Sequence, residues 1–392
     1  MSDWVTAKLK DVAKVVTGKT PQTSNSEYYG GDIPFVSPAD LNEGILSETK
    51  TYLTSSGADQ VYRVPKNTVL VSCIGNLGKL AITAKEVCFN QQINGLIFDE
   101  QKIFPKYGFY FAQTIKPQLE KASSSTTLPI VNKSRFSDLE IKYPPLAEQR
   151  RIASILDQAD ELRQKRQQAI EKLDQLLQAT FIDMFGDPVS NPKGWRSDKN
   201  LGDVADIVSG ITKGRKITGK SLREIPYLAV SNVQDKYLNL SIIKTIEASD
   251  DEIERYRLKQ GDLLLTEGGD PDKLGRGTLW NNEVDECIHQ NHVFRVRLTS
   301  KEFTPNYLNW IVGSEYGKRY FLKSAKQTTG IASINMGQLK KLPLLPPPLD
   351  LQIQFDERCI KIHQIKNQLV DSYKDINHLF SSLQNQAFNG TL

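Results

Sequence analysis

The chain has few of the residues that build disulfide frameworks and metal centres. Its 392 residues include only four cysteines and four histidines. The cysteines are far apart in sequence and form no C-x-x-C pair, which predicts reduced, mostly buried thiols instead of a disulfide framework. They are Cys73, Cys88, Cys287 and Cys359.

Long apolar runs are also missing. No stretch of about 18 apolar residues occurs, and the opening sequence MSDWVTAKLK has no apolar segment behind its charges. We therefore expect neither a membrane span nor a signal peptide, and a cytoplasmic protein. The net charge is +4 and the pI is about 8.6, below the value of about 9 that marks an obvious nucleic-acid binder. Charge thus permits DNA binding without requiring it.

Two long segments contain neither proline nor glycine and are predicted to be helices. The first runs from Leu146 to Phe185, and the second from Leu349 to Asn389. In both, residues recur at alternating spacings of three and four, the pattern of a coiled-coil seam. The first seam is Ile152, Ile155, Ala159, Leu162, Arg166, Ala169, Leu173, Leu176 and Thr180; the second is Phe355, Cys359, Ile362, Lys366, Leu369, Tyr373, Ile376, Phe380 and Leu383.

Each seam needs a partner helix. A helix of this length is roughly 60 Å long, more than one small domain requires. The second helix can bury its seam by running back antiparallel along the first, and the alternative is that each helix packs on its own domain. Arg166 and Lys366 interrupt the seams, either as a polar layer that sets the register or as long side chains that reach past the seam to water.

The globular segments before the two helices are copies of one plan. LKDVAKVVTG, from Leu9, matches LGDVADIVSG, from Leu201, at an offset of 192. Later matches have larger offsets, which indicates insertions in the second copy. Cys88 and Gln91 match Cys287 and Gln290, and Asn132, Pro144, Pro145 and Gln149 match Asn335, Pro347, Pro348 and Gln352. We expect two related globular heads at opposite ends of an antiparallel helical pair.

Candidate DNA contacts are the polar and basic residues on loops that the repeat places equivalently. Lys79 and Arg276 each follow a matched glycine, and an arginine can bond guanine with two hydrogen bonds. Most such contacts go to phosphates, and the alternative is that these residues are solvated or form turns. The full set is Lys19, Thr20, Asn76, Lys79, Ser124, Thr126, Asn132 and Lys133 in the first copy and Thr212, Lys213, Arg215, Lys273, Arg276, Lys326, Thr328 and Asn335 in the second.

Three patterns suggest catalytic or metal chemistry and are weak. GNLGK, at 75–79, is half a phosphate loop without the second part of its spacing. Cys287, His289 and His292 suggest a metal, but the offset pairs His289 with Asn90, so a buried cysteine and two loop or strand histidines are favoured. Turn chemistry explains DPDK at 270–273. No adenine pocket of the N-P-P-Y type and no glycine-rich methyl-donor turn occurs.

With its PPLAEQ helix start at 144–149, its GKTP turn at 18–21 and its FGDPVSNPKGW boundary at 185–195, the chain resembles the specificity subunit of a type I restriction-modification system. The resemblance implies an α+β fold with two α/β target-recognition domains, at 1–145 and 186–348. Two conserved helices, at 146–185 and 349–392, would form the antiparallel coiled coil. The second copy departs from the pattern at GITK, 210–213, and in its PPLDLQ helix start.

The resemblance also implies a function. Each domain would read one half of a split, asymmetric site in double-stranded DNA, and the helices would set the gap and bind two methyltransferase subunits. Catalysis would lie in those subunits and a restriction subunit, with S-adenosylmethionine, ATP and Mg²⁺ bound there and no cofactor in this chain. The partner-binding helix residues would be Glu148, Gln149, Arg150, Arg163 and Gln352.

Other readings remain open. The chain could be a nuclease or methyltransferase with an unfamiliar site, or a coiled-coil scaffold with two protein-binding heads. It could also be an orphan DNA-binding subunit without a restriction partner, or have only one functional head.

Overall fold

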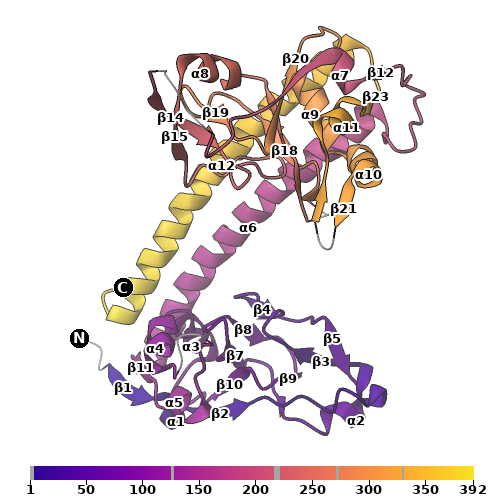
Figure 1. Cartoon of the computed structure of the whole chain (residues 1–392). Helices are drawn as coiled ribbons and strands as arrows, with labels where there is room; N and C mark the ends of the chain where they lie inside the picture. Colours follow the sequence, from indigo (N-terminus) through magenta and orange to yellow (C-terminus); the bar gives the residue numbers. More distant parts are fainter. Residues whose placement is uncertain (1–3, 125–127, 216–220, 271–272, 329–330) are drawn as a thin grey trace. The chain divides into compact units, whose positions relative to one another are not determined.

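A computed structural model gives the structure of the chain and describes all residues except 1–3, 125–127, 216–220, 271–272 and 329–330 (Figure 1). The chain forms two compact units. The first consists of Met1–Gln168 with Asp371–Leu392, and the second of Ala169–Val370. Each unit therefore combines one globular head with a part of both long helices. No helix in the described ranges is long and apolar enough to cross a membrane.

The head of the first unit is a mixed α/β domain. Its main sheet has the strand order β2-β10-β7-β8-β4, a second has the order β5-β3-β9-β6, and β1 pairs with β11. The elements are β1 (Val5–Lys8), α1 (Leu9–Val12), β2 (Ala13–Thr17), a 3₁₀ turn η1 (Ser26–Tyr28), β3 (Tyr29–Val36), β4 (Ile45–Leu46), β5 (Thr51–Leu53), α2 (Ser55–Ala58), β6 (Arg63–Val64), β7 (Val69–Ser72), β8 (Leu80–Thr83), β9 (Val87–Phe89), β10 (Ile93–Phe98), α3 (Pro105–Ala112), α4 (Lys116–Ala122), α5 (Lys133–Ser137) and β11 (Glu140–Tyr143).

The head of the second unit repeats this plan. The order β13-β20-β16-β18 corresponds to the main sheet, β15-β14-β19 to the second, and β12-β23 to the strand pair, while β17-β22-β21 is an additional sheet. Its elements are β12 (Lys199–Asn200), α7 (Leu201–Val204), β13 (Ala205–Ser209), β14 (Arg223–Leu228), β15 (Lys244–Ala248), α8 (Asp250–Tyr256), β16 (Leu263–Thr266), β17 (Gly268–Gly269), β18 (Gly277–Leu279), β19 (Ile288–His289), β20 (Val293–Leu298), α9 (Pro305–Gly313), α10 (Glu315–Ser324), β21 (Lys326–Thr328), β22 (Ile331–Ser333), α11 (Met336–Lys340) and β23 (Pro343–Leu344).

Strand register corrects one part of the sequence alignment of the two copies. Phe35 pairs with Cys88 in the first head, and its counterpart Tyr227 pairs with Ile288 in the second. Cys88 therefore corresponds to Ile288, not to Cys287, and one further step makes His289 the counterpart of Phe89, not of Asn90. The identical cysteines misled the alignment because the extra residue lies before β19. All four cysteines are buried and free.

A glycine approaches the same carbonyl closely in both heads. A Cβ on Gly18 would lie 2.4 Å from the carbonyl oxygen of Phe89, and one on Gly210 would lie 1.9 Å from that of the corresponding His289. No side chain fits at such a distance, so only glycine lets β2 and β13 end against the turn that follows β9 and β19. The matched VTG and VSG endings of the repeat therefore have a steric cause.

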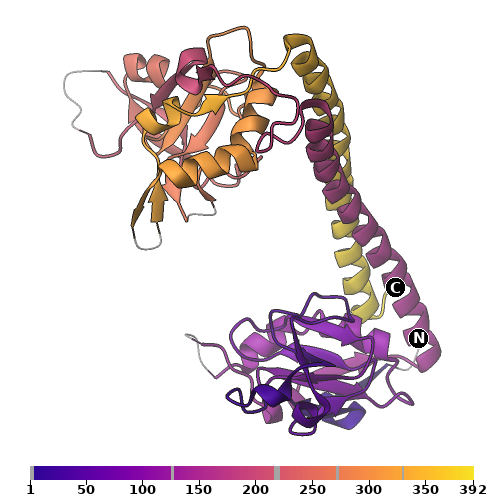
Figure 2. The ribbon, with the colours of Figure 1, turned by 90° about the vertical axis from the view of Figure 1, so that its right-hand side faces the viewer.

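The two long helices, α6 (Leu146–Phe185) and α12 (Leu349–Asn389), pair antiparallel. In the first unit the guanidinium of Arg163 lies 4.6 Å from the ring centroid of Phe380, in a region where the last turns of α12 run beside the first turns of α6 (Figure 2). In the second unit Lys366 Nζ lies 2.5 Å from Asp174 Oδ1 and the rings of Phe181 and Phe355 are 5.6 Å apart. As the residue number along α6 increases from 163 to 181, that of its contact on α12 decreases from 380 to 355. This order confirms the predicted antiparallel pairing.

The predicted seam is correct for α12 and only partly correct for α6. Leu162 and Leu176 are 47% and 48% exposed, whereas Leu156 and Leu177 are buried. The buried residues of α6 differ from the predicted seam because this helix packs against the heads as well as against α12. The three-and-four spacing predicts only the contact with a partner helix. The ion pair of Lys366 with Asp174 favours the reading of Lys366 as a polar layer between the helices.

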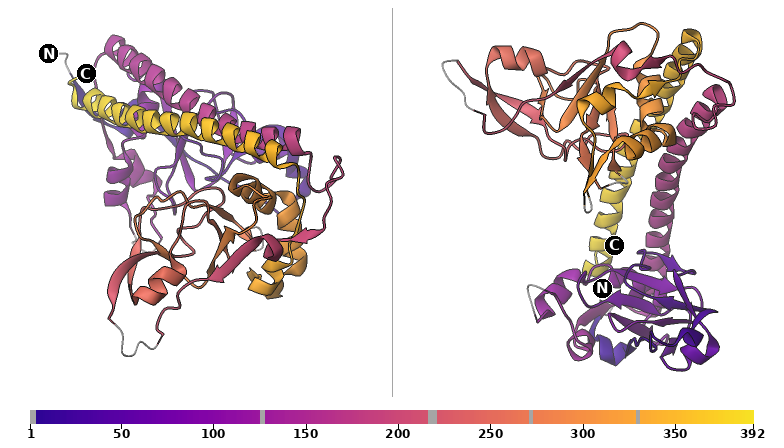
Figure 3. Two further views of the ribbon diagram at one scale, coloured as in Figure 1. Left: turned by 90° about the horizontal axis from the view of Figure 1, so that it is seen from above. Right: turned by 45° about the vertical axis from the view of Figure 1, so that its right-hand side comes forward.

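Aromatic side chains join each head to both helices. In the first unit Tyr107 of α3 packs on Phe388 of α12, with ring centroids 5.4 Å apart. In the second unit Tyr307 of α9 packs on Phe185 of α6, with centroids 4.8 Å apart. The end of α12 also reaches the start of the chain, since Gly390 lies against the ring of Trp4 (Figure 3). Each head is thus held by the start of one long helix and the end of the other.

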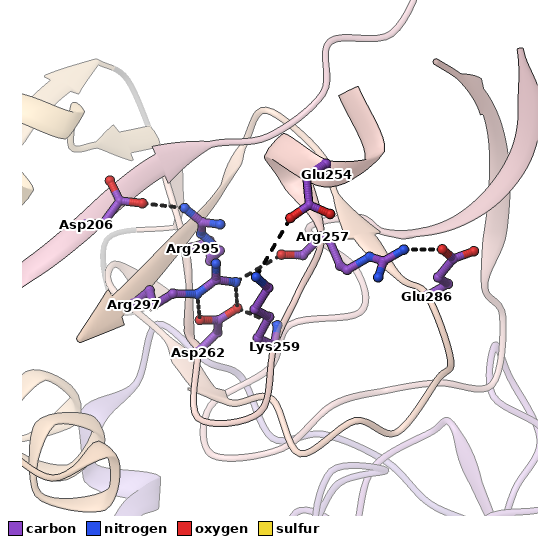
Figure 4. Close-up of polar contacts among 8 residues, drawn as sticks. All are labelled: Asp206, Glu254, Arg257, Lys259, Asp262, Glu286, Arg295 and Arg297. Atoms are coloured by element: carbon purple, nitrogen blue, oxygen red, sulfur yellow. Dashed lines mark hydrogen bonds and ion pairs between the residues drawn. The ribbon is translucent and has the colours of Figure 1, made fainter. Parts of the chain in front are cut away.

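The second head has a buried carboxylate and an arginine at two positions where the first head has neutral residues, and Figure 4 shows the charged network around them. Asp262, only 1% exposed, accepts two hydrogen bonds of 2.7 Å from Arg297. Nearby, Arg295 Nη2 lies 2.5 Å from Asp206 Oδ2. By strand register, the counterparts of Asp262 and Arg297 in the first head are Thr68 and Ile97. Arg257 and Lys259 extend the network to Glu286 and Glu254. One buried carboxylate therefore fixes two strands of the second head.

We expect Asp262→Ala to destabilise the second unit by about 3 kcal/mol, because it leaves Arg297 without its partner at a largely buried position. Urea unfolding, with hydrogen exchange to locate the change, measures this. The double variant D262T/R297I introduces the residues of the first head and should recover most of the loss. The control R319A removes a pair with Glu315 that is 64% and 63% exposed and should cost less than about 0.5 kcal/mol. Equal losses for D262A and R319A would contradict this account.

Candidate nucleic-acid interface

In the first head, three chain segments meet at the turn between β9 and β10, residues 90–92, which we call the first central turn. Gly18 N donates to Ile93 O at 3.1 Å and Lys19 N to Phe89 O at 2.9 Å, so the loop after β2 lies against this turn. Cys73 N donates to Gln92 O at 2.8 Å, which adds the loop after β7. Hydrogen bonds of main-chain groups thus converge on one turn at the end of the main sheet.

A third segment joins through the loop after β7. Gly75 N donates to Pro129 O and Val131 N to Cys73 O, both at 2.9 Å. These bonds bring the segment before α5, which contains the predicted residues Ser124 and Asn132, and the first residue of α5, Lys133, to the same end of the sheet. The three loops that the sequence predicts as DNA contacts are therefore neighbours in the folded head.

The second head builds the same arrangement around its own turn, residues 290–292, the second central turn. Ile211 N donates to His289 O at 2.8 Å, and Glu267 N donates to His292 O at 3.0 Å. Ile334 N donates to Glu267 O at 2.9 Å, so the segment after β22 is included. The loop after β16 is longer than its counterpart and carries the additional strand β17. The shared geometry depends on main-chain groups, which leaves the side chains of the loops free to differ.

Lys79 and Arg276 occupy equivalent positions, as the repeat predicts. Ser72 N donates to Lys79 O at 2.8 Å, and Thr266 N donates to Arg276 O at 3.0 Å. Both residues thus follow a turn that folds back on the last residue of a central strand. Both side chains are half-buried, and Arg276 makes one long hydrogen bond of 3.4 Å to Val230 O. A cation held near the main sheet in this way is well placed to approach a base edge.

The remaining predicted residues of the first head fall into two groups. Lys19, Asn76 and Lys133 are exposed. The others already have structural partners: Thr20 Oγ1 donates to Gln91 Oε1 at 2.6 Å, Ser124 Oγ donates to Ile130 O at 3.2 Å, and Asn132 caps α5 by accepting from Arg135 N at 2.9 Å. Thr126 lies outside the described residues.

In the second head, Arg215 is held by Glu252 through hydrogen bonds of 2.6 and 2.8 Å. This guanidinium lowers the pKa of Glu252 to about 2. Lys213 is exposed and its Nζ lies 5.0 Å from the ring centroid of Tyr227. Together with Lys244, these residues line a hollow of about 400 Å³. An anion in this hollow would be attracted mainly by the two lysines, since Arg215 already has a carboxylate partner.

Five more predicted residues belong to the second head. Asn335 caps α11 by accepting from Gln338 N at 2.9 Å, and Lys273 pairs with Asp270. Thr212 is exposed on the loop after β13, and Lys326 is exposed on β21. The side chain of Thr328 lies outside the described part of the structure.

Sequence reasoning overlooked the central turns themselves. Gln91 is exposed, and Gln92 is half-buried. In the second head, Asn291 is half-buried and His292 is exposed, with its Nδ1 2.7 Å from Glu267 Oε2. The NQQ sequence at 90–92 and the QNH sequence at 290–292, just before β10 and β20, were the available signal, since glutamine and asparagine can bond adenine with two hydrogen bonds.

The partner-binding predictions need one correction. Gln149 and Gln352 are 0% exposed, so neither lies on a helix face that a partner could reach. Glu148 forms a 2.7 Å ion pair with Arg151, and Arg150 is exposed and lies 5.7 Å from the ring centroid of Phe104. Arg163 lies over the ring of Phe380 and pairs with Asp160 at 2.6 Å. Of this set Arg150 is exposed, while the side chains of Glu148 and Arg163 are 29% and 25% exposed.

His289 is a core residue in place of a phenylalanine. Its ring is 0% exposed at the position of Phe89, and its Nδ1 lies 2.7 Å from Val293 O. Desolvation lowers the pKa of His289 to about 4, so the ring is neutral and Nδ1 carries the hydrogen that is donated. No group of three potential metal ligands occurs within the described ranges.

Comparisons with known proteins show the family to which the chain belongs. The family model for the type I restriction modification DNA specificity domain matches residues 1–172 and 192–370. The chain is 23% identical over 416 residues to the StySPI specificity subunit of Salmonella potsdam, a match that covers 99% of this chain and 89% of that protein. It is 29% identical over 253 residues to the MjaIX specificity subunit of Methanocaldococcus jannaschii, covering 59% of this chain and 58% of that protein.

The fold is also similar to a solved structure, the S subunit of a type I restriction-modification system from M. genitalium. The TM-score is 0.55 at 14% sequence identity, and the match covers 99% of this chain and 96% of that one. The chain belongs to the type I restriction-modification DNA specificity family. It is a specificity subunit with two tandem target-recognition domains, one in each unit.

The buried histidine gives the second unit a predicted pH dependence. The unfolded chain binds a proton at His289 below about pH 6.5, while the folded unit does not until about pH 4. Stability is therefore fully present above pH 6.5 and falls by up to about 3 kcal/mol as the pH drops from 6.5 to 4.

His289→Phe, which introduces the residue of the first head, should remove this part of the pH dependence. Urea unfolding at several pH values measures the effect. The control H292Q changes an exposed ring and should keep the pH dependence of the parent protein. If H289F and H292Q have the same pH dependence as the parent, the buried ring is not its source.

Proposed function

We propose that this specificity subunit reads a bipartite, asymmetric site in double-stranded DNA, one half-site per target-recognition domain. The observation that carries this proposal is the convergence of three polar loops on a central turn in each head. A group of loops at one end of a sheet can enter a DNA groove, where a few side chains distinguish base edges and others hold phosphates.

The difference between the two loop sets is the reason to expect an asymmetric site. The first head presents Lys19, Lys79 and a turn with two glutamines. The second presents Lys213, Arg276 and a turn with an asparagine and a histidine. Because their donors and acceptors differ, the two heads would prefer different base sequences.

The two long helices would set the gap between the half-sites and bind two methyltransferase subunits. Leu162 and Leu176 are apolar side chains exposed on α6 and would be available to such a partner. We assign these leucines, with Glu148 and Arg150 of the same helix, to the contact with the modification subunits.

We further infer that the chain is not an enzyme. Methyl transfer and cleavage would belong to the modification subunits and to a restriction or translocase subunit, which would bind S-adenosylmethionine, ATP and Mg²⁺. The support is the family resemblance together with the character of the loops, where polar residues act mostly as caps or ion pairs. The proposal places the protein in the cytoplasm with the DNA that it reads.

Selection from a random duplex library, with the chain bound to its modification subunits, tests the function. We expect two short, different motifs at a fixed gap, and no methyl transfer or cleavage by the purified chain alone. Competitor DNA and moderate salt are needed because non-specific binding depends steeply on salt. A single motif would mean that one head is silent, and the absence of any motif would favour a scaffold with two protein-binding heads.

Two single variants separate base reading from phosphate contact in the second head. Arg276→Gln should relax the preference at one or two positions of one half-site, at a cost of about 1–3 kcal/mol in discrimination. Lys213→Gln should weaken binding to all sequences about equally and reduce the slope of log affinity against log salt by about 1. Titrations on the selected site and on single-base variants at several salt concentrations measure both effects. If R276Q leaves the base preference unchanged, Arg276 contacts only the backbone.

A further inference from the structure

Two glutamines are buried at the points where the heads meet the long helices. Gln149 lies in the first turn of α6 and Gln352 in the first turn of α12, and both are 0% exposed. A glutamine is rarely buried completely, because its amide must then find protein partners for every polar hydrogen. Their contacts show what this burial achieves.

In the first unit, Gln149 connects two segments of the head to its helix. Its Oε1 accepts a hydrogen bond of 2.8 Å from Phe104 N, in the segment that leads into α3. Its Nε2 donates two more of 2.8 Å, to Lys102 O in that segment and to Pro144 O just before α6. Both amide hydrogens and one acceptor position are used, all on main-chain groups.

Gln352 makes the same contacts in the second unit. Its Oε1 accepts from Thr304 N at 3.0 Å, and its Nε2 donates to Glu302 O and Pro347 O, both at 2.9 Å. The residues at the partner positions differ between the units, with phenylalanine and lysine in one and threonine and glutamate in the other. The same hydrogen bonds form in both units because only the main-chain groups of these partner residues take part.

These hydrogen bonds fix a direction that apolar packing leaves loose. A hydrogen bond weakens steeply when its angle departs from linear, whereas the burial of apolar surface has no direction. The aromatic contacts of α3 and α9 hold the helices against the heads but tolerate small rotations. Three hydrogen bonds from one planar amide to two chain segments restrict both the tilt and the rotation of the first helical turn.

A small change in this tilt has a large effect at the other end of a long helix. A helix of 40 residues is about 60 Å long, so a tilt of about 3° displaces its far end by roughly 3 Å. That distance is close to the rise of one base pair along DNA, about 3.4 Å. The junction between a head and its helix must therefore be held within a few degrees if the gap between half-sites is to be fixed.

We propose that Gln149 and Gln352 are positioning residues that set the gap between the two half-sites by fixing the angle at which each long helix leaves its head. They contact neither DNA nor a partner subunit. The inference rests on the proposed function, since it concerns the spacing of the two motifs. It goes beyond that function because it assigns the spacing to two buried side chains at the head–helix junctions.

The test is library selection with the variants Gln149→Met and Gln352→Met, each in complex with the modification subunits. Methionine keeps the length of the side chain and favours helix, but it removes all three hydrogen bonds. The matched controls are Q158M and Q354M, which make the same change at exposed positions of the same helices. We expect both half-site motifs to persist in all variants. For Q149M and Q352M the enrichment of the preferred gap over gaps one base pair shorter or longer should fall at least tenfold, and for the controls it should not change.

Two results would overturn the inference. If both motifs and the gap preference of Q149M and Q352M equal those of the parent, the glutamines do not set the gap. If only the motif of the altered head disappears, the glutamine is needed to fold that head and has no separate positioning role.

A milder pair covers the case in which the methionine variants no longer bind DNA. Gln149→Asn and Gln352→Asn keep the amide but are one methylene too short to reach all three partners, and a broadened gap with both motifs present would support the inference. An unchanged gap or a loss of binding would reject it. A parent protein that selects no pair of motifs would instead refute the proposed function, which keeps the two failures distinct.

Discussion

The structure depends on the burial of two helices that are too long to be covered by one head. Each unit solves this with the start of one helix, the end of the other and one short helix of the head, α3 or α9. Aromatic residues contribute to the contact, as in the packing of Tyr107 on Phe388 and of Tyr307 on Phe185. Because rings bury a large area at a modest cost in side-chain entropy, a few of them are enough to hold each head on two helices.

The repeat separates what must stay constant from what can vary. The constant features are main-chain contacts: the approach of Gly18 and Gly210 to the following turn, the hydrogen bonds that join three loops to each central turn, and the bonds of Gln149 and Gln352. The loop side chains add contacts that differ between the heads, such as that of Thr20 with Gln91 and that of His292 with Glu267. A protein built in this way can change the chemistry of its reading surface without changing the position of that surface on the head.

The heads differ in their interiors as well as in their loops. The second head has Asp262, Arg297 and His289 where the first has Thr68, Ile97 and Phe89, all within the same strand pattern. The buried carboxylate of Asp262 is tolerated because Arg297 donates two hydrogen bonds to it. The buried imidazole of His289 is tolerated because it remains neutral. The two domains therefore have the same architecture but different responses to acid and to the loss of one side chain.

Sequence patterns were sufficient for the features that depend on local periodicity or on repetition. The absence of proline and glycine defined the two helices, and the spacing of their residues indicated a seam. The order of heads and helices along the chain gave the antiparallel direction, and the offset matches revealed the tandem domains and their equivalent loops. Periodicity and repetition can both be read directly from the order of residues in one sequence. The seam of α6 was partly misassigned, at Leu162 and Leu176, because a periodicity does not say which of two neighbouring faces also meets a head.

Only the tertiary structure decided the rest. It assigned His289 to the place of Phe89, since strand register outweighs the match of two cysteines, and it brought Gln91, Gln92 and His292 to the centre of the loop groups. It also placed Gln149 and Gln352 inside the junctions, although both lie on helices whose sequences suggest a solvated surface. Sequence by itself determined which elements form and that they form twice; the three-dimensional contacts decided which polar side chains are available to DNA, because hydrogen bonds between distant segments leave no periodic trace in the chain.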